Sequence, residues 1–231
     1  KQTETLQEVP VTVTAIGGDT LEKYQVNEIA DVVSRVPALN VQVGGSGSGG
    51  QISLRGVGSS NISAAFDSAV AFDFDGVQVS TMRMVQAGFF DVQQIDVLKG
   101  PQSLFFGKSA SAGVFAIRSA NPTQEWEMAG KASYEFEEKG YTIGGHISGP
   151  ISDTLGIRVA AQYQDIEDYV KLAPGTPAFN PDGSVRDSRG LSNFISRVTL
   201  QWDPADNFSA NLKLNYVKNK SDGAVGHTDI N

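Results

Sequence analysis

The chain has 231 residues, of which 40% are hydrophobic, carries a formal net charge of −8 and contains no cysteine. This length allows one or two domains with a sizeable core. The acidic balance disfavours a nucleic-acid partner, which requires a basic face, and the absence of cysteine excludes a disulfide framework. No run of about 18 apolar residues is present, so no membrane-spanning helix is expected, although barrel strands would escape this criterion.

Short helices and strands alternate in the first half of the chain. The alternation of residues 9–16 predicts a strand, and the capping-box spacing of Asp19 and Glu22 predicts a short helix after it. A second helix is predicted from Asn27 until Pro37 ends it. One face of this helix is expected to be buried, because aliphatic residues recur there at i, i+3, i+4 and i+7: Ile29, Val32, Val33 and Val36.

Further short strands follow, predicted at 39–43, 52–55, 70–74, 77–79 and 94–98. The pair Asp75-Gly76 separates two of them and is typical of a two-residue hairpin turn. This half of the chain is therefore interpreted as a small α+β domain with a mixed sheet.

The stretch from Val97 to Arg118 invites a nucleotide-binding interpretation through its Gly107-Lys108-Ser109. A phosphate-binding loop has four residues between its first glycine and Gly-Lys-Ser, and a helix follows it. Here six residues separate Gly100 from Gly107, and the residues after Ser109 are typical of a strand. A soluble nucleotide-binding enzyme remains an alternative that rests on this tripeptide alone.

Other catalytic or metal-binding constellations are not evident. No serine lies in a nucleophile elbow. The two histidines, His146 and His227, are far apart in sequence, and each is expected to lack a partner. Asp73 and Asp75 lack the further ligands of a calcium loop and are interpreted as a strand residue and a turn residue. We therefore predict that the chain is not an enzyme and has no cofactor and no metal site.

After Asn121-Pro122 the pattern changes to five long segments that alternate apolar and polar residues, near 126–136, 141–148, 155–164, 194–202 and 208–216. Turns are predicted at Gly140, Gly149–Asp153 and Asp203–Asn207, and a loop from about Lys171 to Gly190.

Each of these segments is long enough to cross a bilayer as a tilted strand. The apolar face carries aromatic residues near the strand ends, where a membrane barrel has its aromatic girdles: Trp126, Tyr141, Tyr163, Trp202, Phe208 and Tyr216. A soluble antiparallel sheet is the alternative, but soluble strands average only about five or six residues. The pattern favours antiparallel strands of a transmembrane β-barrel.

Taken in order, several motifs of this chain resemble a TonB-dependent outer-membrane receptor: Val9-Pro10-Val11-Thr12-Val13, the helix that closes at Val36-Pro37, Leu54-Arg55-Gly56, Asp75-Gly76-Val77 and Val97-Leu98-Lys99-Gly100-Pro101. The resemblance implies an α+β plug domain at residues 1–122. It also implies that residues 123–231 form the first strands, about five, of a barrel of about 22 strands, incomplete here. The chain is expected to be a fragment, with the TonB box and the signal peptide before Lys1. The turn at Gly149–Asp153 resembles a periplasmic turn, which makes 171–190 an extracellular loop.

The resemblance also implies a function in the bacterial outer membrane. Such a receptor captures an extracellular ligand, most often a ferric siderophore, and imports it through the plugged barrel with energy from the TonB complex of the inner membrane. The expected partners are that complex (through a segment preceding Lys1), the small-molecule ligand and outer-membrane lipid. A non-transporting structural or docking component of a cell-surface assembly, built on the same fold, is the alternative.

By family position, the ligand is expected to meet three loops at the apex of the plug, through Ser46, Ser48, Asn61, Met82, Arg83 and Met84. Arg83 is the candidate for an anionic ligand. Arg55 and Lys99 are expected to hold the plug through glutamates of the barrel that lie beyond residue 231. Lys99 stands where the family usually has arginine, and lysine lacks the bidentate geometry of a guanidinium.

Overall fold

A computed structural model of the chain describes residues 12–24, 26, 29–42, 51–59, 69–79, 89–102, 106, 110–137, 139–171, 178–179, 185–186 and 188–221. These residues form two compact units that divide between Ala120 and Asn121. The domain limits 1–122 and 123–231 stay a prediction.

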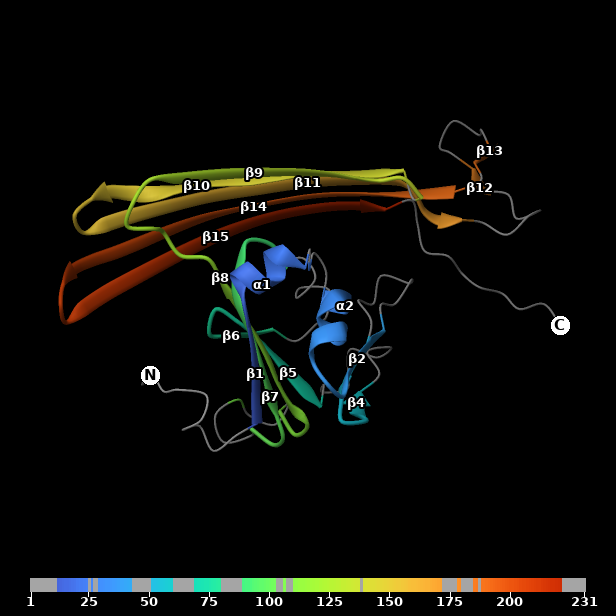
Figure 1. The fold of residues 1–231 in the computed structure, drawn as a ribbon, viewed down its shortest axis with the longest axis horizontal. Helices are drawn as coiled ribbons and strands as arrows, with labels where there is room; N and C mark the ends of the chain where they lie inside the picture. Colours follow the sequence, from blue (N-terminus) through green and yellow to red (C-terminus); the bar gives the residue numbers. More distant parts are fainter. Residues whose placement is uncertain are drawn as a thin grey trace. The chain divides into compact units, whose positions relative to one another are not determined.

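The first unit is built from short helices and strands (Figure 1). The helical segments are α1 (Gly18–Lys23), α2 (Ile29–Val32) and the 3-10 helix η1 (Val33–Arg35). The strands are β1 (Thr12–Gly17), β2 (Leu39–Gln42), β3 (Gln51–Leu54), β4 (Val57–Ser59), β5 (Val70–Phe74), β6 (Val77–Val79), β7 (Val92–Lys99) and β8 (Gly113–Ser119). The predicted strands and the first helix are found at these places, whereas the second predicted helix is α2 followed by η1, and β4 was not predicted.

Two sheets organise this unit. The larger has the strand order β1-β7-β8-β5-β6, and the smaller has the order β2-β3-β4. In the larger sheet β5 pairs with β8 in parallel, whereas the other neighbours are antiparallel, which confirms the predicted mixed sheet. The predicted helix face packs into the core, because Ile29, Val32 and Val36 are at most 1% exposed.

Two tight hairpin turns connect strands in this unit. Asp75 and Gly76 have φ angles of 52° and 88°, so both adopt the left-handed conformation of the predicted two-residue turn between β5 and β6. Arg55 and Gly56 form a similar turn between β3 and β4, with φ angles of 55° and 77°. Arg55 was expected to end a strand, and that assignment was wrong because Gly56 allows the chain to reverse at this point.

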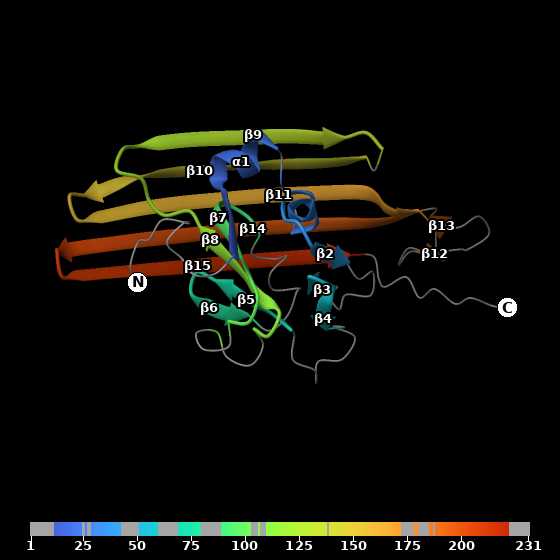
Figure 2. The same cartoon turned by 60° about the horizontal axis from the view of Figure 1, so that its bottom comes forward.

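The second unit contains one sheet of long strands (Figure 2). Its strands are β9 (Glu127–Glu135), β10 (Gly140–Ser152), β11 (Leu155–Lys171), β14 (Ser188–Ala205) and β15 (Phe208–Ser221). Between β11 and β14 the chain forms a two-stranded sheet of β12 (Ala178–Phe179) and β13 (Val185–Arg186). The order of the long strands is β15-β14-β11-β10-β9, and all neighbours are antiparallel, so the five predicted strands are confirmed.

The predicted turns of this unit were too long. Gly149 and Pro150 belong to β10, where they pair with Ile157 and Gly156, and the turn is Asp153-Thr154. A break in register after Pro150 accommodates the proline, which lacks the amide proton of a regular ladder.

The other boundaries shift in the same direction. Gly140 begins β10, residues 203–205 end β14, and Asp206-Asn207 is the turn that follows. Lys171 and residues 188–190, which were assigned to the long loop, also lie in strands.

Candidate functional site

The two faces of the long sheet differ in exposure. Large apolar side chains on one face are open, with Met128 81%, Leu214 59% and Ile143 56% exposed. On the polar face Arg197 is 1% exposed, and Ser148 and Thr199 are fully buried. A soluble sheet would bury its apolar face and solvate its polar one. The exposed face is therefore suited to lipid.

Aromatic side chains lie near both ends of this apolar face. Trp202 and Phe208 are in contact at one end, with ring centroids 5.7 Å apart, and Tyr141 and Tyr163 are 5.9 Å apart at the other. On β14 the apolar face runs from Trp202 to Phe194, which is about 26 Å of strand at about 3.3 Å per residue. An apolar band of about 25 Å between aromatic girdles is characteristic of outer-membrane barrels.

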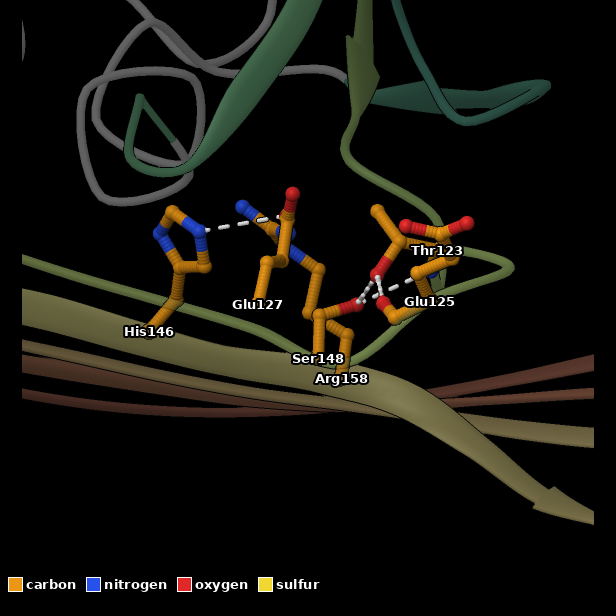
Figure 3. Close-up of polar contacts among 6 residues, drawn as sticks. All are labelled: Thr123, Glu125, Glu127, His146, Ser148 and Arg158. Atoms are coloured by element: carbon orange, nitrogen blue, oxygen red, sulfur yellow. Dashed lines mark hydrogen bonds and ion pairs between the residues drawn. The ribbon is translucent and has the colours of Figure 1, made fainter.

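A charged cluster lies on the polar face, where β9, β10 and β11 are neighbours (Figure 3). The Glu127 Oε1 atom accepts a hydrogen bond from Arg158 Nη1 at 2.9 Å and lies 3.3 Å from His146 Nε2. The Arg158 side chain is 8% exposed and the Glu127 side chain 47%. His146 was expected to lack a partner, and this prediction was wrong because strand pairing sets Glu127 opposite Ser148, next to His146 on the same face.

The chain segment that leads into β9 crosses this polar face. We name residues 121–126 the strap. The Thr123 amide donates to Ser148 Oγ at 2.9 Å, and the hydroxyl oxygens of these two residues also lie 2.9 Å apart (Figure 3). The Thr123 hydroxyl donates to the Glu125 carbonyl at 2.8 Å. The middle of the strap is therefore bonded to β10.

The strap makes further contacts on either side of Thr123. Asn211 Nδ2 on β15 donates to Asn121 Oδ1 at 3.3 Å. A Cβ atom at Gly156 on β11 would lie 2.8 Å from Pro122 Cβ. At the end of the strap, the Trp126 ring lies against Gly149 of β10 on the apolar face. The strap therefore runs from β15 past β11 to β10 before the chain enters β9.

In the first unit, the carboxylate of Asp75 fixes the end of β8. Asp75 Oδ1 accepts from the Ser119 amide at 2.9 Å, and Oδ2 accepts from the Ser119 hydroxyl at 2.6 Å. Ser119 is 1% exposed. The predicted turn residue therefore also holds the last residue of the sheet, a role that its sequence context did not indicate.

The six residues predicted to meet a ligand lie outside the described residues: Ser46, Ser48, Asn61, Met82, Arg83 and Met84. Gly107-Lys108-Ser109 and His227 also lie outside them. The next strand after the Gly-Lys-Ser stretch is β8, as predicted, where a phosphate-binding loop would need a helix. Arg55 is exposed in its turn, and Lys99 ends β7 opposite Thr12 and Gly113. Their pairing with barrel glutamates stays a prediction.

Within the described ranges, no group of three or more histidine, aspartate or glutamate residues is placed to hold a metal ion. The helices in the same ranges are all too short or too polar to cross a membrane.

Known proteins match both parts of the chain. Residues 5–114 match the family model of the TonB-dependent receptor plug domain. The pesticin receptor of Yersinia enterocolitica is 31% identical over 209 residues, which are 87% of this chain and 29% of the receptor. The ferric yersiniabactin uptake receptor of Yersinia pestis is similar in structure, with a TM-score of 0.65 and 27% identity over 85% of this chain and 29% of that one.

The pyoverdine outer membrane receptor of Pseudomonas aeruginosa is similar in structure, with a TM-score of 0.73 and 18% identity over 94% of this chain and 29% of the receptor chain. At this identity the similarity is evidence for the fold alone. The chain thus spans less than a third of the pesticin receptor and of the ferric yersiniabactin uptake receptor.

An α+β plug followed by up-and-down strands with a lipid-facing side defines the N-terminal part of a plugged outer-membrane barrel. The chain belongs to the TonB-dependent receptors, a family of the outer membrane whose members are receptors and transporters and not enzymes.

Proposed function

We propose that the complete receptor carrying this chain captures a ferric siderophore at the cell surface and imports it with energy from the TonB complex. The observation that carries the proposal is the similarity of both units to a ferric yersiniabactin uptake receptor over 85% of the chain. TonB would act through a segment that precedes Lys1.

Import through this fold requires the plug to have two states. A barrel of about 22 strands encloses a wide lumen, which an immobile plug would keep closed. A ligand or a partner shifts the plug only if it favours one state over the other, and TonB supplies this bias by pulling. The pull would first reach β1, which lies at the edge of its sheet and bonds to β7 through six residue pairs.

The ligand would contact the plug through Ser46, Ser48, Asn61, Met82, Arg83 and Met84. Arg83 is proposed to attract the anionic charge of a ferric siderophore, since its guanidinium is always protonated. Arg55 and Lys99 would hold the plug in the barrel through glutamates of later strands. These roles follow from family position, and substitution of Arg83 tests the contact with the ligand.

The experiment compares cells that make the complete receptor with and without TonB. The probes are ferric yersiniabactin, ferripyoverdine and hemin, each labelled with radioactive iron. Accumulation of one ferric siderophore only in the cells with TonB is expected, with Arg83→Ala weakening binding more than Arg83→Lys. Surface binding without TonB-dependent accumulation would favour the alternative, a docking component of a surface assembly. Equal accumulation in both cells would contradict the proposal.

A further inference from the structure

We infer that the strap is a fixed part of the barrel wall during uptake, so that the ligand passes on the side of the strands that follow β15. This inference rests on the proposed import function. It concerns the second unit by itself, because each contact of residues 121–126 that carries it is made with β10, β11 or β15.

The hydrogen bonds of the strap are those of a docked segment. The Thr123 amide donates to the hydroxyl of Ser148, and the hydroxyl oxygens of the two residues lie 2.9 Å apart. Ser148 is fully buried. Releasing the strap would break these hydrogen bonds. Asn121 accepts a further hydrogen bond from Asn211 on β15, which is separated from β10 by β11 and β14.

The polar face of the barrel wall also leaves room for the strap at one glycine. Gly156 lies under Pro122, and a Cβ at Gly156 would lie 2.8 Å from Pro122 Cβ. Glycine inside a strand weakens it and often marks a place where another part of the chain approaches closely. Pro122 adds stiffness, because its ring fixes φ. A freely moving linker would need neither feature.

The position of the strap limits the path of the ligand. It runs from Asn211 on β15 to Ser148 on β10, close to the turns Asp153-Thr154 and Asp206-Asn207. These strands are three places apart in the sheet, and at about 4.8 Å per strand the strap covers about 14 Å of wall. No siderophore fits between surfaces in van der Waals contact, so passage there would require the strap to leave.

A disulfide across the strap tests this inference. The natural sequence of the chain contains no cysteine. Thr123→Cys and Ser148→Cys place two thiols where hydroxyl oxygens are 2.9 Å apart. The pair is introduced into the complete receptor, made free of other cysteines, and accumulation of radioactive ferric yersiniabactin is measured with the pair oxidised and reduced.

The expected result is TonB-dependent accumulation without loss in the oxidised form. If oxidation abolished accumulation and a reductant restored accumulation, the inference would be overturned. Failure of the two cysteines to form a disulfide would also overturn it. A receptor that accumulates no probe of the panel even when reduced would contradict the proposed function, and the labelling experiment below would then decide on the strap alone.

Thiol labelling gives a readout that needs no ligand identity. A single Ser148→Cys should stay protected from a periplasmic maleimide both in energised cells and in cells without TonB, because Thr123 covers the position. Asp153→Cys, in the exposed turn next to β10, is the matched control and should be labelled in both. Labelling of Ser148→Cys only in energised cells would show that the strap leaves and would overturn the inference.

Discussion

The close contact between Pro122 of the strap and Gly156 of β11 can be tested by adding one methyl group at Gly156. A Cβ atom there would lie 2.8 Å from Pro122 Cβ and 3.5 Å from its Cγ. Non-bonded carbon atoms pack at about 3.5–4.0 Å, so Gly156→Ala must separate strand and strap by about 1 Å. The proline ring cannot rotate away as a long side chain would, so the backbone has to move.

The expected cost follows from this overlap. Overpacking a close contact costs about 1–3 kcal/mol. The usual gain of about 0.4–1 kcal/mol from replacing glycine by alanine acts on the unfolded chain, so it does not change the equilibrium between docked and undocked strap. We expect docking to weaken by about 2 kcal/mol, which is a factor of about 30.

The assay is the redox equilibrium of the cysteine pair at 123 and 148 with glutathione, which gives the effective concentration of one thiol at the other. Gly156→Ala should lower this value by a factor of about 30. Gly130→Ala is the matched control in the same sheet, since its Cβ would meet no atom closer than 3.7 Å, and it should leave the value unchanged. An unchanged effective concentration in Gly156→Ala would refute the reasoning.

Three further predictions concern the plug and the lipid-facing side. Val13 and Leu98 face each other across β1 and β7, so cysteines at both positions can form a disulfide between the two strands. TonB-dependent accumulation should stop when this pair is oxidised and return when it is reduced. Unchanged accumulation would show that uptake does not require these strands to part. Asp75→Ala should destabilise the plug by about 2 kcal/mol, because alanine loses both hydrogen bonds to Ser119 and is strained at a φ of 52°. Asp75→Asn should destabilise it by less. Hydrogen exchange at the end of β8 measures both effects. Leu214→Arg on the apolar face should reduce the folded fraction in lipid vesicles at a cost of about 2–4 kcal/mol. Lys213→Arg on the opposite face should not, and equal yields would contradict lipid exposure of Leu214.

Local sequence patterns were sufficient for most of the fold. The spacing of Ile29, Val32 and Val36 predicted the buried face of the segment that forms α2 and η1, and Asp75-Gly76 predicted the hairpin between β5 and β6. The long alternating segments predicted both faces of the second sheet, since the side-chain period of a strand is two. Strand ends were less predictable, because Gly149-Pro150 is a turn signal in sequence and becomes part of β10 through a bulge.

The contacts of the polar face depend on strand register, which a single sequence does not reveal. Asn121 and Asn211 are ninety positions apart and meet because three intervening strands align. The proximity of His146 to Glu127 likewise requires the pairing of β9 with β10. The ligand-contacting residues were assigned by family position alone, and they lie outside the described residues.

TonB-dependent import is tested most directly by the time course of iron accumulation. Cells that make the complete receptor are given radioactive ferric yersiniabactin, ferripyoverdine or hemin, and matched cells lack TonB. We predict continuous uptake of one ferric siderophore in the first cells, and only saturable surface binding in the second. The same continuous uptake in both would contradict an energy-coupled receptor.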